Sequence, residues 1–405
     1  MHPAPPPPHR DDPDAKAMLA LAARAGVRGM GRVEPNPMVG CVIVRAARSG
    51  ASEEHRPARE RIIGIGHHRA FGGPHAEVDA IASAKRQGHS GLLAGATAYV
   101  TLEPCNHHGK QPPCTEALIR ERLARVVFAR ADPNPLAAGG ANRLRAAGIE
   151  CHEFSGSPAA VALSDPFIKR LRTDLPWVIA KWAQTIDGRT ATRTGHSQWI
   201  SNERSRHLVH ALRGRVDAML TGIGTVLADD PLLTPRGVPA RRTPLRVVID
   251  PDMAMPADCK LARTARESPV LAVHCAGQVV AGLHKRPEVA ARLATLADAG
   301  VHFFVAPQEA GLLGLRATLR HLRAAHGVST VLVEAGAGLL GRLLAGGLVD
   351  QAAVFTGPMI LGDQQAPGPA RGLETPTIDA ATRLNLQMLR RVGQDSMAVY
   401  GIGSA

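Results

Sequence analysis

Three residues able to bind a metal and one further carboxylate stand in two short motifs of the chain. His75 and Glu77 occur in PHAE, and Cys105 and Cys114 enclose the loop of PCNHHGKQPPC. One imidazole and two thiolates are a typical ligand set of a catalytic zinc site, which keeps a fourth position open for water. Zinc lowers the pKa of a bound water to about 7, so a nucleophile becomes available at neutral pH. Glu77 can then act as the general acid/base that passes a proton from this water to a departing amine.

The order of these motifs is more informative than any single residue in it. A lone histidine before a helix is commonly a cap or a surface residue, and a lone intracellular cysteine is commonly a packing residue. The pattern HxE followed by PC and a second cysteine is typical of zinc deaminases that act on amino-bearing bases. Eight residues separate Cys105 from Cys114, which is longer than the usual gap. The sequence therefore predicts a zinc-dependent deaminase with a long loop between two of its ligands.

Both halves of the expected metal site stand where a helix is predicted to begin. AEVDAIASAK follows His75, and TEALIRERL follows Cys114. Residues two apart on a helix do not share a face, but His75 and Glu77 can converge on a metal that lies beyond the helix N-terminus. The positive end of the helix dipole favours thiolate and hydroxide there. We therefore expect two helix N-termini to face one metal.

The predicted strands and helices alternate, which indicates two layered α/β domains. In the first, a helix at residues 15–28 precedes two hairpin strands that are separated by a charged insert at 51–60, to which no role can be assigned. In the second, the predicted strand PWVIAKWA opens a series of strands and helices that reaches the end of the chain. The predicted boundaries are a disordered Pro-rich tail at 1–14, a deaminase domain at 15–154, a linker at 155–175 and a second domain at 176–405.

Composition limits the class of protein. A length of 405 residues fits two domains at about 100 to 200 residues each, and 45% apolar with 20% charged residues is typical of a globular protein. No apolar run reaches the ~20 residues of a membrane span, and no secretory signal opens the chain. Aromatic residues make up only 3%, so stacking platforms are not expected. Six scattered cysteines favour a reducing cytoplasm.

The net charge of +13 has two interpretations, and composition alone does not decide between them. It favours anionic partners such as phosphates, nucleotides or nucleic acid. It is equally typical of arginines spread over solvated faces.

The motifs together resemble the bifunctional deaminase–reductases of riboflavin biosynthesis. The matching stretches, in order, are PNPMVGCVIV, PHAEVDA, ATAYVTLEPCNHHGKQPPC, ADPNP, DGRTA, SQWIS, GIGTVLADDPLLTPR and VEAGAGLLGRLLAGGLVD. The resemblance implies an N-terminal cytidine-deaminase-like α/β/α domain and a C-terminal dihydrofolate-reductase-like α/β domain, with zinc and NADPH as cofactors. It also accounts for the long gap between the two cysteines.

The resemblance also implies two successive reactions. The first domain would hydrolyse an amino group from 2,5-diamino-6-(5-phosphoribosylamino)pyrimidin-4(3H)-one. The second would use NADPH to reduce the ribosyl side chain of 5-amino-6-(5-phosphoribosylamino)uracil to a ribityl chain. The expected partners are phosphorylated pyrimidines and further copies of the chain, with no nucleic acid and no membrane.

In the first domain, the resemblance places zinc on His75, Cys105 and Cys114 and the proton transfer on Glu77. It places substrate contacts on Asn36, His107 and Lys110. Asn36 can equally be a turn residue, and His107 and Lys110 can equally be solvated residues of a loop tip. Asn106 and Gln111 depart from the family's common residues in this loop, and we expect adjusted contacts rather than loss of activity.

In the second domain, the clearest motif from the residues alone is VEAGAGLLG, where a glycine-rich turn leads from a strand into a helix. Such a turn can bind a pyrophosphate through free amides or can be simply a turn. By resemblance, the cofactor side comprises Ala183, Trp199, Thr225, Asp229, Gly336, Ala337, Gly338, Leu339, Leu340, Gly341 and Arg342. The substrate side comprises Ser197, Arg213, Leu233, Arg236 and Glu334.

Several of these assignments keep a structural alternative. Arg213 and Arg236 suit a sugar phosphate, but each can be a surface charge, and Trp199 can be a core residue. Lys181 and Asp229 are candidate proton donors to the sugar carbonyl. Pro251 stands where the family often has a hydroxyl that assists cofactor binding, so we expect that contact to be absent.

Two other functions use the same residues. The zinc chemistry would also suit a deaminase of tRNA or of a free nucleoside, but the large second domain with motifs of its own argues against it. A nucleic-acid-binding protein with a structural zinc would normally supply four protein ligands. This sequence supplies three and an additional glutamate.

Overall fold

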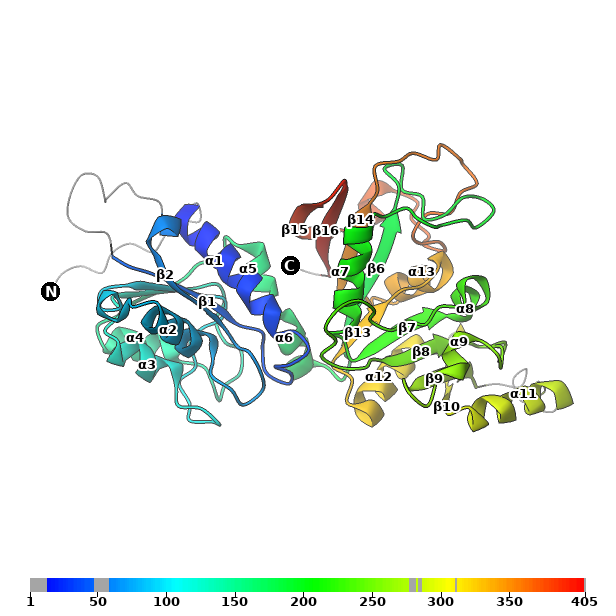
Figure 1. The fold of residues 1–405 in the computed structure, drawn as a ribbon, viewed down its shortest axis with the longest axis horizontal. Helices are drawn as coiled ribbons and strands as arrows, with labels where there is room; N and C mark the ends of the chain where they lie inside the picture. Colours follow the sequence, from blue (N-terminus) through cyan, green and yellow to red (C-terminus); the bar gives the residue numbers. More distant parts are fainter. Residues whose placement is uncertain (1–12, 47–57, 277–281, 283–285, 310–311, 404–405) are drawn as a thin grey trace. The chain divides into compact units, whose positions relative to one another are not determined.

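The structure is a computed structural model that describes residues 13–46, 58–276, 282, 286–309 and 312–403 (Figure 1). Nearly all of the predicted Pro-rich tail and most of the charged insert at 51–60 lie outside the described residues. The chain divides into two compact units, Met1–Arg172 and Thr173–Ala405, which are described separately below.

A five-stranded sheet in the order β2-β1-β3-β4-β5 forms the centre of the first unit. β1 pairs antiparallel with β2 and β3, whereas β3, β4 and β5 run parallel. The predicted hairpin is confirmed by the β1–β2 pairing. The chain that follows the carboxyl ends of β3 and β4 therefore meets at one edge of the sheet, the usual place for a site in such folds. The strands are β1 (Gly40–Val44), β2 (Ile62–His67), β3 (Thr97–Val100), β4 (Arg125–Phe128) and β5 (Glu150–Glu153).

Helices cover both faces of this sheet, because alternate residues of each strand point to opposite sides. α2, α3 and α4 pack on one face, and α1 and α5 pack on the other. Gly66 of β2 lets α2 approach closely, since a Cβ there would overlap the backbone of Ala80. The expected α/β/α arrangement is confirmed. The helices are α1 (Pro13–Gly26), α2 (Ala76–Arg86), α3 (Cys114–Arg120), α4 (Gly140–Ala146), α5 (Pro158–Ala162) and α6 (Asp165–Arg172).

The segment 155–175, which the sequence predicts as a linker, is mostly helical. α5 and α6 belong to the first unit, which extends to Arg172. Ala160 is fully buried in the same core as α1, and Arg130, which follows β4, bonds to the carbonyl of Val161 and to the carboxylate of Asp165. These contacts make most of the segment part of the first unit.

A nine-stranded sheet forms the centre of the second unit, in the order β10-β9-β8-β7-β13-β6-β14-β16-β15. The pairs from β10 to β14 are parallel, and β16 and β15 add an antiparallel end. Its strands are β6 (Trp177–Gln184), β7 (Ala218–Gly222), β8 (Leu245–Ile249), β9 (Val270–Cys275), β10 (Val301–Ala306), β13 (Thr330–Val333), β14 (Gln351–Thr356), β15 (Leu384–Val392) and β16 (Asp395–Ile402). A separate pair is formed by β11 (Gln308–Glu309) and β12 (Leu312–Leu313).

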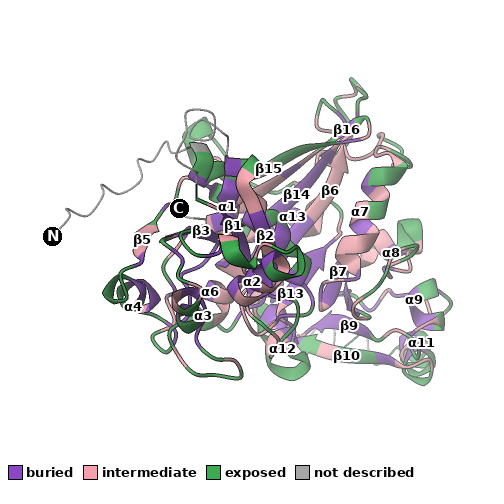
Figure 2. Cartoon of the chain, turned by 60° about the vertical axis from the view of Figure 1, so that its left-hand side comes forward, coloured by how far each residue is buried: buried purple, intermediate pink, exposed green. Residues whose placement is uncertain are grey.

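One hydrophobic core joins six strands of this sheet to α11, α12 and α13; the strands are β6, β7, β8, β9, β10 and β13. β8 and β9 are buried along their whole length, as expected for strands covered on both faces. β15, at the edge, is mostly exposed (Figure 2). The helices are α7 (Glu203–Arg213), α8 (Ile223–Asp229), α9 (Lys260–Arg263), α11 (Pro287–Asp298), α12 (Leu315–His326) and α13 (Ala337–Ala345).

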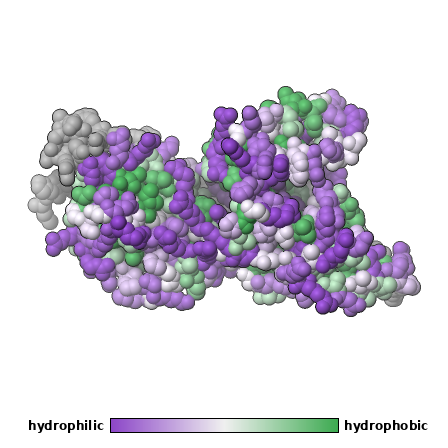
Figure 3. Space-filling view, viewed as in Figure 1, coloured by the Kyte–Doolittle hydropathy of each residue, from purple (hydrophilic) through white to green (hydrophobic). Residues whose placement is uncertain are grey.

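Hydrophilic residues dominate the face visible in Figure 3, with hydrophobic residues in small groups between them. Within the described ranges, no helix is long and apolar enough to span a bilayer.

Candidate active sites

Three ligand atoms meet at one edge of the first sheet. Nδ1 of His75 lies 3.4 Å from Sγ of Cys105 and 3.3 Å from Sγ of Cys114. A tetrahedral zinc with its usual bond lengths holds nitrogen and sulfur ligands about 3.6 Å apart, so the donor set and its spacing fit this metal. In the part of the chain that the structure describes, these residues form the one such group.

Helix starts position two of the three ligands, as the sequence predicts. His75 is the N-cap of α2, and Cys114 is the first residue of α3, after the N-cap Pro113. The backbone amide of Cys114 donates a hydrogen bond to Sγ of Cys105 at 3.4 Å. Peptide dipoles at both helix starts therefore favour negative charge at the sulfur atoms.

The ionisation of Cys105 suits metal binding, and that of Glu77 suits proton transfer. The hydrogen bond from the Cys114 thiol is the main cause that lowers the pKa of Cys105 to about 4, and His75 acts in the same direction, although burial opposes this. The same hydrogen bond and burial raise the pKa of Cys114, so the two thiols ionise in separate steps. Burial raises the pKa of Glu77 to about 7, and the charge of Cys105 acts in the same direction. A carboxyl group with this pKa can both accept and release a proton near neutral pH.

The loop between the cysteines is held by two residues that depart from the family pattern. Gln111 donates a hydrogen bond from Nε2 to the carbonyl of Gly72 at 2.8 Å. Asn106 accepts a hydrogen bond from the hydroxyl of Thr115 at 3.1 Å. Both side chains thus brace the loop from the protein side.

A cavity of about 220 Å³ opens beside the metal ligands. His75, Glu77 and Cys105 line it together with all three predicted substrate-binding residues, Asn36, His107 and Lys110. The structure therefore gathers at one cavity residues that lie far apart in the sequence. Further residues of its lining, which sequence analysis missed, are His68, Phe71, Asp132, Asn134 and Phe167. Asp132 and Asn134 belong to the quoted motif ADPNP, whereas Phe167 lies in the predicted linker and gave no signal.

In the second unit, positive charge surrounds a carboxylate that is only 14% exposed. Glu334 follows β13, and its two oxygens accept hydrogen bonds from Arg213 at 2.7 and 2.9 Å. Lys181 of β6 lies 3.7 Å from the same carboxylate. Burial alone would raise the pKa of Glu334, but Arg213 and Lys181 lower it to about 2. Glu334 is therefore ionised at every physiological pH and serves as a hydrogen-bond acceptor.

Arg236 lies close to this cluster. Its backbone amide donates a hydrogen bond to Nδ1 of His210 at 3.3 Å, and burial and the charge of Arg213 lower its pKa. Leu233 of the same segment is buried and has a φ of 54°, a left-handed conformation that is uncommon for leucine. Two of the predicted substrate-side arginines thus stand near one carboxylate.

The predicted phosphate-binding turn forms the start of α13, with Gly336 as its N-cap. The amide of Leu340 already donates to the carbonyl of Gly336, so the amides available to a ligand are those of residues 337–339. The guanidinium of Arg371 lies about 3.4 Å from where a Cβ on Gly338 would be. The amides of residues 337–339, together with the cationic side chain of Arg371 close to Gly338, fit an anionic cofactor such as the expected dinucleotide. Gly341 instead packs against the backbone of Arg371, and Arg342 donates to the carbonyl of Leu313.

The remaining predicted cofactor and substrate residues are spread over β6, α8 and the loop after β6. Ala183 lies in β6, Ser197 and Trp199 in the loop, and Thr225 and Asp229 in α8. Trp199 is 63% exposed and lies against Arg206 at 4.5 Å, which excludes the core alternative for this residue.

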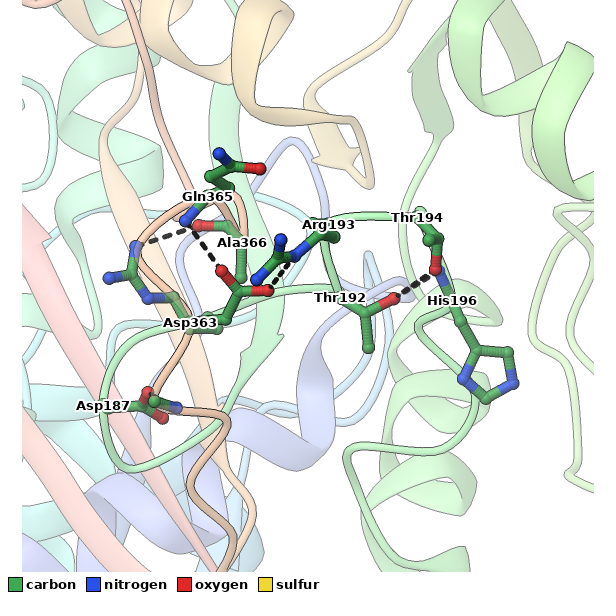
Figure 4. A network of polar contacts seen from close by, with 10 residues as sticks. Asp187, Thr192, Arg193, Thr194, His196, Asp363, Gln365 and Ala366 are labelled. Carbon is green, nitrogen blue, oxygen red and sulfur yellow. Dashed lines mark hydrogen bonds and ion pairs between the residues drawn. The ribbon is translucent and has the colours of Figure 1, made fainter.

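Polar contacts attach the loop after β6 to the loop after β14 (Figure 4). Arg193 donates to Asp363 at 2.6 Å, and Arg189 donates to the carbonyl of Ala366 at 2.9 Å. Asp187 accepts a hydrogen bond from the amide of Gly362 at 2.9 Å. The loop that carries Ser197 and Trp199 is thus fixed at its base.

Comparison with known proteins assigns both units. The profile of the cytidine and deoxycytidylate deaminase zinc-binding region matches residues 13–130, and that of the RibD C-terminal domain matches residues 176–398. The riboflavin biosynthesis protein RibD of Escherichia coli is 36% identical over 403 residues, covering 93% of this chain and 96% of the relative. RibD of Aquifex aeolicus is 34% identical over 386 residues, covering 95% and 98%.

A solved structure is also similar over nearly the whole chain. It is a diaminohydroxyphosphoribosylaminopyrimidine deaminase/5-amino-6-(5-phosphoribosylamino)uracil reductase from Thermotoga maritima. The TM-score is 0.67 and the identity 29%, covering 96% of this chain and 99% of the other.

Proposed function

The chain belongs to the RibD family of riboflavin biosynthesis proteins, and we propose that its two sites perform two successive reactions. The chain is a bifunctional deaminase and reductase. The first site hydrolyses an amino group from 2,5-diamino-6-(5-phosphoribosylamino)pyrimidin-4(3H)-one. The second reduces the ribosyl side chain of 5-amino-6-(5-phosphoribosylamino)uracil to a ribityl chain with NADPH.

At the first site, His75, Cys105 and Cys114 hold the zinc ion. Zinc supplies Lewis acidity and a nucleophile at neutral pH when it is bound. Glu77 accepts a proton from the attacking water and gives it to the departing amino group, and its pKa of about 7 supports both steps. The observation that carries this assignment is that the three ligand atoms lie within 4.8 Å of one another, and that His75 and Cys105 line one cavity together with Glu77.

The same cavity supplies the substrate contacts of the deaminase. Asn36 hydrogen-bonds the polar edge of the pyrimidine, and His107 and Lys110 contact the phosphoribosyl group. Their position in the lining supports this assignment. Lys110 is suited to a phosphate because it is a mobile point charge with three donors.

At the second site, NADPH would supply a hydride when it is bound, and the start of α13 would hold its phosphates. Arg213 and Arg236 bind the substrate phosphate, with Ser197 and Leu233 as further contacts. Lys181 gives a proton to the carbonyl oxygen of the ring-opened sugar. The ionised Glu334 keeps Lys181 charged and in place, which is supported by the distance of 3.7 Å between them.

The wider organisation of the protein completes the assignment. The deaminase domain comprises residues 15–154 with the helical segment up to Arg172, and the reductase domain begins near residue 176. The six cysteines are free, which supports a reducing compartment such as the cytoplasm. Exposed leucines on the edge strand β15 support a homo-oligomer, which sedimentation would measure.

One assay tests both reactions. The diaminopyrimidine phosphate is supplied to the intact protein with and without NADPH, and ammonia and ribityl product are measured. We expect ammonia in both cases and the ribityl product only with NADPH. Tight, salt-sensitive RNA binding without turnover would instead support the nucleic-acid-binding alternative.

A further inference from the structure

Two phenylalanines line the deaminase cavity, although aromatic residues are scarce in this chain. The sequence contains seven phenylalanines, three tryptophans and two tyrosines among 405 residues. Phe71 and Phe167 both contribute to the wall of the one cavity beside His75 and Glu77. Because composition predicts no stacking platform, the gathering of two aromatic rings at this site calls for a specific role.

Phe71 is held in place although it is partly open to solvent. The residue is 46% exposed, and Nζ of Lys110 lies 4.0 Å from the ring centroid. A cation at this distance is attracted by the face of the ring. The amide of Phe71 donates to the carbonyl of Arg32 at 2.9 Å, and the next residue, Gly72, accepts the hydrogen bond from Gln111. The loop between the cysteines and the segment that carries Phe71 therefore form one wall of the cavity.

Phe167 reaches the same cavity from α6, the last helix of the first unit. Ile168, the next residue, is buried, and its amide donates to the carbonyl of Ser164. The ion pair of Asp165 with Arg130 fixes the start of α6 to the chain after β4. All of these contacts lie within the first unit.

A planar heteroaromatic substrate needs two kinds of contact. Its polar edge needs hydrogen-bonding groups, which this cavity offers in Asn36, Asp132 and Asn134. Its faces need apolar or aromatic surface, and base–aromatic stacking is a large and sequence-tolerant source of affinity. The lining offers rings for this purpose in Phe71 and Phe167.

We propose that the pyrimidine ring of the deaminase substrate stacks on Phe167 and Phe71, and that Phe167 is a substrate-binding residue of this reaction. The inference rests on the proposed deaminase function. The proposal also makes α6, which lies in the segment predicted as a linker, a required part of the deaminase site. The competing explanation is that Phe167 only packs α6 against the first unit.

The test compares Phe167→Leu, Phe167→Ala and Phe167→Tyr in the full chain. Leucine retains most of the apolar volume but has no aromatic face, whereas tyrosine retains the ring. We expect KM for deamination to rise about tenfold with alanine and several-fold with leucine, with kcat changed less than twofold, and tyrosine to stay near wild type. Leu171→Ala, on the same helix and half exposed, is the matched control and should not change KM.

Two readouts separate binding from folding. Zinc content reports the integrity of the first unit, and reduction of supplied 5-amino-6-(5-phosphoribosylamino)uracil reports that of the second. Both should be unchanged in every variant. Phe71→Ala, at a half-exposed position, should raise KM as well without loss of zinc.

The outcomes are distinct. A wild-type KM in Phe167→Leu would overturn the stacking role and leave packing as the explanation. A fall in kcat at unchanged KM would overturn it too, since a stacked ring acts on binding. Failure of the wild-type protein to release ammonia would instead refute the deaminase function itself.

Discussion

Replacing Arg213 by methionine should destabilise the reductase domain by leaving a buried carboxylate without its main partner. Arg213 makes two hydrogen bonds, of 2.7 and 2.9 Å, to Glu334, and each side chain is only 14% exposed. Despite burial, Arg213 and Lys181 hold the pKa of Glu334 at about 2 instead of 4.5. This difference is equivalent to about 3 kcal/mol in favour of the ionised form. Because Lys181 remains, we expect Arg213→Met to cost about 2 to 3 kcal/mol at pH 7.

Urea unfolding followed by tryptophan fluorescence measures this loss selectively. The three tryptophans, Trp177, Trp182 and Trp199, all lie in the second unit. Arg390→Met is the matched control, because Arg390 is exposed on β15, and it should change the free energy of unfolding by less than about 0.5 kcal/mol.

The dependence on pH provides a second check. Since the folded-state pKa of Glu334 is depressed, its stabilising contribution is fully present above the unfolded-state pKa near 4.5 and is lost as pH falls toward about 2. The stability gap between wild type and Arg213→Met should therefore be present at pH 7 and narrow below pH 4.5. The double variant Arg213→Met/Glu334→Leu should recover part of the loss, because it removes the uncompensated charge. A single variant no less stable than the Arg390 control, or a double variant less stable than the single one, would refute this reasoning.

Three further perturbations separate the two sites. Gly140→Ala would place a Cβ against the carbonyl oxygen of Pro104 and displace Cys105, so zinc affinity should fall at least about tenfold in a chelator competition. Gly341→Ala would overlap the carbonyl of Arg371, so NADPH binding and the melting temperature should both fall while ammonia release persists. Removal of zinc by a chelator should abolish ammonia release and leave the NADPH-dependent reduction of supplied deaminated substrate intact; loss of both would argue against separate sites.

The metal site could be predicted from the sequence, because the types and spacing of its residues define its chemistry. Zinc prefers few residue types as ligands, and histidine and cysteine are among them. The residues that follow His75 and Cys114 predict the helices that position these two ligands. The first helix begins at Ala76 as predicted, and the second begins at Cys114, one residue before its predicted start. Local patterns of this kind depend on neighbouring residues alone, so they can be interpreted without the tertiary structure.

Contacts between distant segments were not accessible in the same way. Glu334 and Arg213 lie 121 residues apart, and nothing in either local sequence predicts their bidentate pairing. Resemblance placed both on the substrate side but did not predict the buried ion pair or the low pKa of Glu334. Such pairs depend on the order of strands in the sheet, which puts β13 between β6 and β7.

The elements that sequence analysis missed lack a burial pattern. β15 is an edge strand whose residues are mostly exposed, so no alternation of apolar and polar residues marks it. α6 lies in the segment predicted as a linker; its sequence is strongly polar, and Ile168 is its buried residue. The contribution of Phe167 to the cavity depends on how α6 packs against the rest of the first unit, which the sequence does not predict.

The central claim is that two independent active sites work in one chain, and the Glu77→Gln variant tests it most directly. Glutamine keeps the size of the side chain but cannot transfer the proton, and Glu77 is not among the three zinc ligands. Zinc content, ammonia release and NADPH-dependent reduction of supplied deaminated substrate are measured on the same preparation. We predict full zinc content, no measurable ammonia release and unchanged reduction. Wild-type ammonia release, or loss of reduction together with deamination, would contradict the account.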